Sequence, residues 1–216
     1  DPMNPITLIE TGRIHYREAG LATHLGVPLS ISKPAVGRFR GVARRFDRLG
    51  SFVPGRLLPT LQEPSAAMGP VAAPTVPVVD DYAHHPEEIR AFLQAAREAF
   101  PNRHLVAVFQ PHQAFRTEAL LKTFVESLAA ADEVLMLDVY AARETTSDPR
   151  NRALPLAIAR QLAQRGTAAA HAASFDAAVE WLRWKTPANG VVLTVGAGNV
   201  DEVAHRLVTT PTRLAA

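Results

Sequence analysis

The sequence predicts an α/β fold with a Rossmann-like, mostly parallel sheet and helices on both faces. Four apolar runs, each followed by a helix-like segment, lie at Val76–Val79, Leu105–Phe109, Val134–Val139 and Val191–Val195. Strands that alternate with helices are typical of a parallel sheet covered on both sides. Polar clusters that directly follow three of these runs are the second observation, because ligands of such sheets bind beyond the carboxyl ends of the strands.

Composition narrows the class of protein. The 216 residues, 47% of them hydrophobic, can bury one good core or two small ones. We expect neither a membrane span nor a signal peptide, and we expect a cytoplasmic protein. The absence of cysteine excludes disulfides, thiolate metal sites and cysteine nucleophiles. A net charge of +2, without a basic stripe interleaved with aromatic residues, argues against nucleic acid as a partner.

The chain divides into three parts by pattern. Residues 1–50 form a short front unit with helices expected over Arg17–Leu25 and Lys33–Phe39. Residues 51–77 contain six prolines without helical or strand periodicity and are interpreted as a loop or linker. Residues 78–216 carry the alternating pattern and form the main domain.

The first helix of the main domain is the best marked. Pro86 suits the first helical position, and Glu87 and Glu88 complement the positive end of the helix dipole. One apolar face follows, made by Ile89, Phe92, Leu93, Ala96 and Phe100. Further helices are expected over Thr117–Ala130, Arg152–Gln164 and Ser174–Trp184.

Three polar clusters are expected to converge on one rim of the sheet. They are DDYAHHP (Asp80–Pro86), QPHQAFRT (Gln110–Thr117) and DVYAARE (Asp138–Glu144). Each falls where a strand leads into a helix, which is where open parallel sheets build their sites.

Carboxylates and imidazoles crowd the first cluster. Asp80, Asp81, His84 and His85 could suggest zinc or manganese, but adjacent histidines point to opposite sides, so at most one joins a given neighbour. We therefore expect hydrogen-bonding roles and no metal site. Asp80 and Asp81 also alternate in direction, so one is expected to cap backbone groups while the other faces a ligand.

Arginines mark two further stretches. Arg116 beside His112 is suited to clamp a carboxylate or phosphate, although it could instead pair with an acid on its own helix. Arg44 and Arg45 precede a phenylalanine in GVARRFDRLG, which from the residues alone indicates a strand edge with one arginine in solvent and the other in a salt bridge.

TVGAGNVDEV (Thr194–Val203) resembles half of a dinucleotide-binding fingerprint. The third glycine position holds Asp201, however, so a tight strand-to-helix turn explains the two glycines better than a nucleotide site does.

Taken in order, these stretches resemble the carboxyl-terminal third of UDP-N-acetylmuramate:L-alanine ligases of the Mur ligase family. The resemblance runs from about Gly41 to the end and is interrupted by the proline-rich insertion; its strongest pieces are DDYAHHP and FQPH. It implies an enzyme that activates the muramic carboxylate with ATP and Mg²⁺, after which the amine of L-alanine attacks the acyl phosphate during peptidoglycan synthesis. It also implies that residues 1–50 are a remnant of the central ATP-binding domain and that residues 78–216 are the Mur ligase carboxyl-terminal domain.

The resemblance also implies roles for individual residues. Arg45 would approach the ATP phosphates and Asp81 the ribose hydroxyls. Tyr82, His84 and His112 would line the side of the acyl phosphate and the amino acid, where catalysis occurs.

Departures from the family pattern bear on binding. Arg116 would hold the alanine carboxylate, but Gln113 stands where the family usually has an arginine. Ala141–Arg143 replace a proline, a small residue and a glycine, and the front helix GRIHYREAGLATHLGVP lacks the family's adenine-side asparagine. GxxxxGK[ST] does not occur, so the phosphate-binding loop is missing.

Two hypotheses follow. In the first, the chain is the closing domain of a ligase whose amino-terminal and central domains are missing here, and it is inactive alone. In the second, it is a degenerate relative that binds a protein or a wall precursor, as a regulatory module, without chemistry.

Overall fold

The computed structural model describes residues 26–28, 30–31, 43–55 and 74–209. The helices expected over Arg17–Leu25 and Lys33–Phe39 lie outside these ranges. Within the described ranges, no helix is long and apolar enough to cross a membrane.

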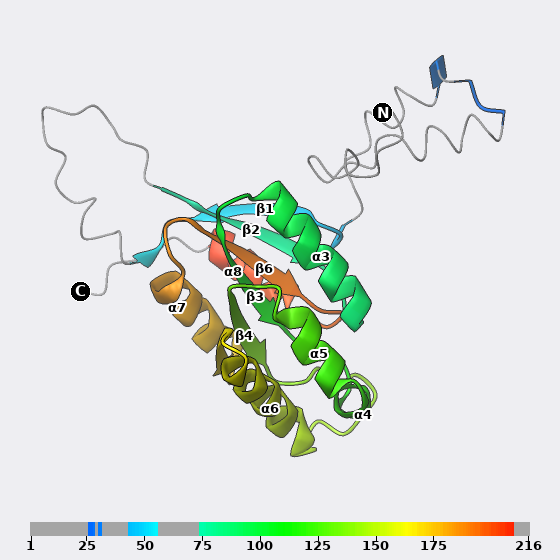
Figure 1. Ribbon diagram of the computed structural model, residues 1–216, viewed down its shortest axis with the longest axis vertical. Helices are drawn as coiled ribbons and strands as arrows, with labels where there is room; N and C mark the ends of the chain where they lie inside the picture. Colours follow the sequence, from blue (N-terminus) through cyan, green and yellow to red (C-terminus); the bar gives the residue numbers. More distant parts are fainter. Residues whose placement is uncertain (1–25, 29, 32–42, 56–73, 210–216) are drawn as a thin grey trace, which may run out of the picture.

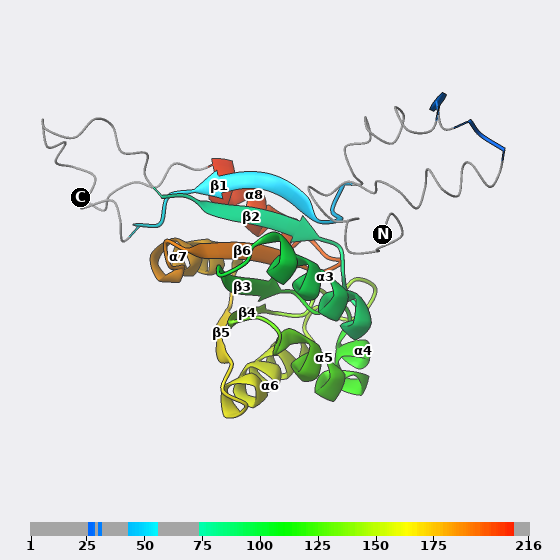
Figure 2. The ribbon, with the colours of Figure 1, turned by 45° about the horizontal axis from the view of Figure 1, so that its top comes forward.

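Six strands form one mostly parallel sheet, as the sequence predicts (Figure 1). The strands are β1 (Asp47–Phe52), β2 (Val76–Asp81), β3 (His104–Phe109), β4 (Glu133–Leu137), β5 (Ala168–Ala172) and β6 (Gly190–Val195). Their order across the sheet is β1-β2-β6-β3-β4-β5. All neighbouring pairs are parallel except β1 and β2, which run antiparallel at one edge (Figure 2). Residues 47–52 therefore fold with the strands that follow them.

Helices cover both faces of the sheet. They are α3 (Pro86–Ala99), α4 (Ala114–Ala119), α5 (Leu121–Leu128), α6 (Arg150–Gln164), α7 (Phe175–Lys185) and α8 (Asp201–Thr209). Buried side chains of α3, α5 and α6 pack on one face, and those of α7 and α8 pack on the other. Because both faces are covered, successive residues of β3 alternate between the two cores: Leu105 belongs to the first and Val106 to the second.

The parallel register brings four strand ends into line. Asp81 of β2 lies beside Val195 of β6, Val195 lies beside Phe109 of β3, and Phe109 lies beside Met136 of β4. The loops that leave these strands therefore start from one edge of the sheet.

Capping explains where α3 begins. His85 is the N-cap residue, its ring accepting from the Glu87 N–H, and the Glu88 carboxylate bonds back to the His85 N–H. Pro86 occupies the first helical position, where the missing N–H has no consequence. This confirms the start predicted from the sequence.

One expected helix was wrong in detail, and one strand was missed. The single helix predicted over Thr117–Ala130 is two helices, α4 and α5, and α4 begins earlier because the Glu144 carboxylate accepts from the Ala114 and Phe115 N–H groups. Strand β5 was not predicted, because Ala168–Ala172 reads AAAHA and lacks the β-branched residues that mark strands.

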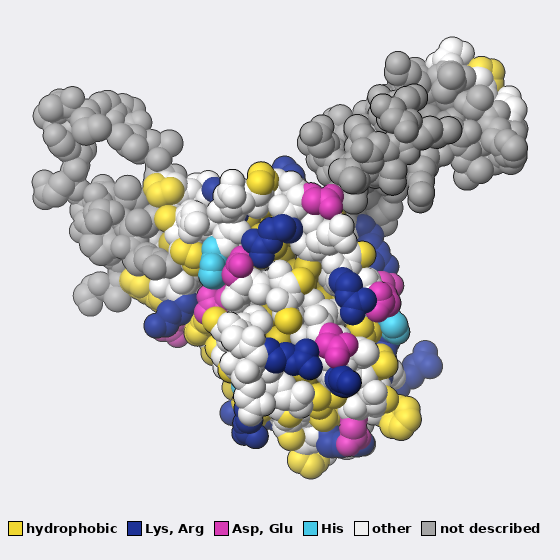
Figure 3. Space-filling view, in the orientation of Figure 1, with side chains coloured by type: hydrophobic (Ala, Val, Ile, Leu, Met, Phe, Trp, Pro, Cys, Tyr) yellow, Lys and Arg dark blue, Asp and Glu magenta, His cyan; other side chains and the backbone are white. Residues whose placement is uncertain are grey.

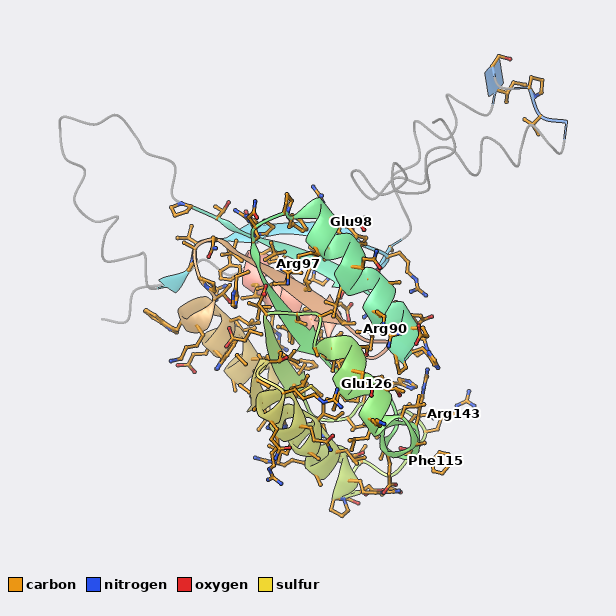
Figure 4. The ribbon with its side chains drawn as sticks, viewed as in Figure 1. Arg90, Arg97, Glu98, Phe115, Glu126 and Arg143 are labelled. Atoms are coloured by element: carbon orange, nitrogen blue, oxygen red, sulfur yellow. The ribbon has the colours of Figure 1, made fainter. Side chains whose placement is uncertain are left out.

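The surface over α3 and α5 mixes charges of both signs (Figure 3). Arg90 pairs with Glu87 on α3, and Arg97 reaches Asp132 beyond α5, at 2.7 and 3.0 Å. Figure 4 shows Arg90, Arg97 and Glu98 spread along α3. Exposed pairs of this kind add little stability.

We expect Leu→Ala substitutions at a buried and at an exposed position to differ in their effect on stability. Leu193 on the central strand β6 is 0% exposed, whereas Leu156 on α6 is 40% exposed. We expect Leu193→Ala to lower the unfolding free energy by about 2–5 kcal/mol, because it leaves a cavity between two packed layers. Leu156→Ala should change it by less than about 0.5 kcal/mol. Urea denaturation of both variants measures the difference, and equal losses would contradict the described core.

Candidate functional site

Asp80, the last residue but one of β2, is a fully buried carboxylate with two partners. It is 0% exposed; its Oδ1 accepts from the Thr194 hydroxyl at 2.6 Å and its Oδ2 from Arg44 Nε at 2.9 Å. Burial raises the pKa of Asp80, and the Thr194 hydroxyl and Arg44 oppose the rise. Asp80 faces the interior, so of the two aspartates it is not the one that could face a ligand.

The Arg44 guanidinium links β2 to two turns: the turn that precedes β1, which contains Arg44 itself, and the turn between β6 and α8. Beyond Asp80, it donates to the carbonyls of Gly198 at 2.9 Å and Gly196 at 2.8 Å, and it lies 3.7 Å from Asp201. Planar guanidinium geometry suits several acceptors at once. Arg44 and Arg45 both form salt bridges, with Asp80 at 2.9 Å and with Asp81 at 3.4 Å, so the expectation that one arginine would lie in solvent is wrong. Both lie in the turn that precedes β1 rather than in the strand.

Close packing explains the two glycines of the β6–α8 turn. A Cβ at Gly198 would lie 2.5 Å from Gln110 Oε1 and 2.8 Å from Tyr140 Cγ, and one at Gly196 would lie 2.7 Å from the Gln110 carbonyl oxygen. The prediction of a tight strand-to-helix turn is confirmed: β6 ends at Val195 and α8 begins at Asp201.

Asp81 caps backbone groups. Its Oδ2 accepts from the Phe46 N–H and its Oδ1 from the Ala83 N–H, both at 2.8 Å, and Arg45 approaches Oδ1 at 3.4 Å. Burial raises the pKa of Asp81, while these two backbone N–H groups and Arg45 oppose the rise. The carboxylate therefore fixes the turn before β1 against the loop after β2.

Arg45 and Tyr82 present the exposed side of this junction. The Arg45 side chain is 46% exposed, and its guanidinium carbon lies 5.7 Å from the centre of the Tyr82 ring. Arg44 lies over the same ring at 5.0 Å. Cations over the ring face hold the tyrosine at the rim, where it remains 38% exposed.

Four rings form a row along the rim. The ring centres of Tyr82 and His84 are 5.4 Å apart, those of His84 and His112 are 6.3 Å apart, and those of His112 and Tyr140 are 5.6 Å apart. They come from the ends of β2, β3 and β4. We call Tyr82, His84, His112 and Tyr140 the ring row.

Glu88 of α3 contacts both the backbone and the ring of His84. One Glu88 oxygen accepts from the His84 and His85 N–H groups at 3.0 and 3.1 Å and lies 3.4 Å from His84 Nδ1. Partial burial raises the pKa of Glu88, but these N–H groups and the His84 charge outweigh it, so the pKa is lowered overall. The two histidines diverge, as expected: His84 faces the ring row, and His85 caps α3.

His112 is the half-buried centre of the ring row. Its Nδ1 is enclosed and has no hydrogen-bond partner among the described residues. Burial lowers the pKa of His112, nearby His84 and Arg116 lower it further, and Glu144 opposes them. A bridge between His112 and Tyr140 continues the pairing of β3 with β4.

Arg116 and Gln113 lie beyond His112, at the start of α4. In the described part of the chain, the Arg116 guanidinium has no ion-pair or hydrogen-bond partner, so the alternative of pairing with an acid on its own helix is not realised. Gln113 has φ 66° and ψ 127°, which is strained for a residue with a side chain, and its N–H donates to the Tyr140 carbonyl. Figure 4 shows Phe115 and Arg143 both projecting outward at the α4 end of the molecule.

Three residues of this rim, Tyr140, Gln110 and Glu144, were not predicted as site residues. Tyr140 packs on His112, Gln110 is buried against Gly198, and Glu144 caps α4. All three lie in the strand-end clusters already identified, and that location was the available signal. Among the residues described, no three carboxylate, imidazole or thiol side chains come together as metal ligands.

Comparison with known proteins identifies the family. The Mur ligase, glutamate ligase domain matches residues 68–198. The chain belongs to the Mur ligase family. The resemblance inferred from DDYAHHP and FQPH is thereby confirmed at the level of the family.

Two relatives of this Mur ligase domain have the same name. The UDP-N-acetylmuramate--L-alanine ligases of Acidithiobacillus ferrooxidans and Caldanaerobacter subterraneus are each 38% identical to it, over 86% and 85% of the chain. The chain spans only 35% of the length of either relative. The crystal structure of UDP-N-acetylmuramate-alanine ligase MurC from Thermotoga maritima is similar with a TM-score of 0.62 and 29% identity, over 88% of this chain and 34% of that one.

The geometry of the Mur ligase domain predicts different consequences for its two adjacent arginines. Arg44→Lys should lower the unfolding free energy by about 1.5–3 kcal/mol, because a single ammonium cannot reach Asp80 and both carbonyls. Arg45→Lys, at the exposed position, should change it by less than about 0.5 kcal/mol. Guanidinium chloride denaturation tests the pair, and comparable losses in both variants would refute the anchoring role of Arg44.

Proposed function

We propose that this Mur ligase domain is the amino-acid- and nucleotide-closing domain of a cytoplasmic, ATP-dependent UDP-N-acetylmuramate:L-alanine ligase. The observation that carries the proposal is the ring row, with the exposed Arg45 beside Tyr82 and with Arg116, which has no partner among the described residues, near His112. Such a rim presents donors and cations outward, which suits phosphate and carboxylate groups. Residues 1–50, 51–77 and 78–216 would be a central-domain remnant, a linker and the carboxyl-terminal domain, respectively.

The nucleotide side would be formed by Arg45 and Asp81. Arg45 has rotational freedom to reach a phosphate, because its contact with Asp81 is long, at 3.4 Å. Asp81 is 7% exposed and already accepts two backbone N–H groups, so it would approach the ribose hydroxyls with its remaining lone pairs.

The amino-acid side would be formed by the ring row and α4. Arg116 would hold the alanine carboxylate in a charge-assisted pair, with Gln113 contributing at most a neutral hydrogen bond. Tyr82, His84 and His112 would line the path of the amine toward the acyl carbon. Holding the amine in line with that carbon replaces a bimolecular encounter with a positioned attack.

ATP and Mg²⁺ require the rest of the ligase. The described residues bring together no set of three metal ligands, and GxxxxGK[ST] does not occur in the chain. When bound in the full ligase, Mg²⁺ would supply charge neutralisation at the phosphates, and its ligands would come from outside the described residues. This domain would contribute the closing surface that excludes water from a hydrolysable acyl phosphate.

A second candidate is a non-catalytic binding or regulatory module. The observation that favours it is Gln113, because a neutral side chain in a strained conformation stands at a position where a cation would strengthen carboxylate binding. Loss of one charge-assisted bond costs about 1.5–3 kcal/mol.

Phosphate release separates the two candidates. We expect the chain alone to release no alanine-dependent phosphate from ATP, Mg²⁺ and UDP-N-acetylmuramate. When the amino-terminal and central domains of the Acidithiobacillus relative are fused before it, turnover should appear. Turnover by the chain alone would refute the partial-ligase proposal, and a folded, ATP-binding fusion without turnover would support the binding module.

The same fusion tests the carboxylate clamp. Arg116→Ala should raise the KM for L-alanine about 10–100-fold, through loss of a charge-assisted bond. Lys122→Ala, an exposed cation on α5, is the matched control and should leave the KM unchanged. An unaltered KM in Arg116→Ala would remove the assignment.

A further inference from the structure

The protonation state of His112 can be inferred from its surroundings. The ring lies between those of His84 and Tyr140, with centres 6.3 and 5.6 Å away. Nδ1 is enclosed and without a partner in the described part of the chain, whereas Nε2 also lacks a partner but is not enclosed. The two ring nitrogens therefore have different environments.

Only one protonation state leaves no buried donor unpaired. An imidazolium carries N–H on both nitrogens, so its Nδ1–H would be buried without an acceptor. The neutral Nδ1–H tautomer has the same defect. The neutral Nε2–H tautomer leaves a lone pair on Nδ1 and places its N–H on the accessible edge, and orphaned buried N–H groups are the rarer defect in proteins.

Neighbouring charges also disfavour the cation. His84 faces the ring from the loop after β2, and Arg116 faces it from α4. Glu144, from the loop after β4, opposes them, and its carboxylate already accepts from the N–H groups of Ala114 and Phe115. Burial, His84 and Arg116 together lower the pKa of His112.

We propose that His112 is held as the neutral Nε2–H tautomer and donates a hydrogen bond to an anionic oxygen of a carboxylate or phosphate group bound beside Arg116. A neutral donor next to a guanidinium that has no partner among the described residues matches such an oxygen, because both groups present N–H donors to it. The identity of the ligand rests on the proposed function, whereas the tautomer does not. His112 would then stabilise negative charge, and the proton lost by an attacking amine would go to another group.

Nitrogen-15 NMR of the ring tests the tautomer directly. Long-range ¹H–¹⁵N spectra of the labelled chain, with the His112 signals identified by their loss in His112→Gln, should show a protonated Nε2 and an unprotonated Nδ1 at pH 7. On acidification the ring should take up a proton only below its ordinary pKa of 6.5. Exposed His205 on α8 gives an internal control for sample pH. A protonated Nδ1 at pH 7 would overturn the inference.

Titration with sodium phosphate and, separately, sodium acetate tests the donor and distinguishes the two oxygen sources. Gln places an N–H near the position of Nε2 and Asn places one near Nδ1, so His112→Gln should bind the preferred anion within about threefold of the parent chain, and His112→Asn about tenfold more weakly. Equal binding by both variants, or no binding of either anion by the parent chain, would overturn the donor role. These spectra use the chain alone, so their outcome is independent of ligase turnover.

Discussion

The candidate site depends on how two buried aspartates at the end of β2 are compensated. Asp80 and Asp81 are 0% and 7% exposed, and an isolated ionised carboxylate at such depth is strongly disfavoured. Arg44 and Thr194 bond to the first, and two backbone N–H groups bond to the second. Since these partners come from the turn before β1, from β6 and from the loop after β2, the same bonds join three segments at one rim.

The fixed rim carries exposed rings and cations. Arg44 also binds the carbonyls of the β6–α8 turn, which packs Gly198 against Tyr140, and Tyr140 in turn packs on His112. These contacts hold the ring row, while Arg45 beside Tyr82 is exposed and Arg116 near His112 has no partner among the described residues. This division between anchored and available cations is what the proposed binding of phosphate and carboxylate groups would require.

The sequence was informative where local chemistry decides the structure. Buried parallel strands appear as apolar runs, and α3 carries its own N-terminal signals at His85, Pro86 and Glu88. It was uninformative where a distant residue decides: α4 starts at Ala114 because of Glu144, thirty residues further along. Which aspartate faces inward depended on Thr194, a residue of β6. The roles proposed for Tyr82, His84 and Arg116 stay predictions.

Amide hydrogen exchange tests the central claim, that Asp81 fixes the turn before β1 to the strand ends. The Phe46 and Ala83 N–H groups donate to its carboxylate, whereas the Arg45 N–H has no acceptor among the described residues. The first two amides should exchange at least about 100-fold more slowly than that of Arg45. Exchange of all three at unprotected rates would show that the turn is not anchored and would contradict the account.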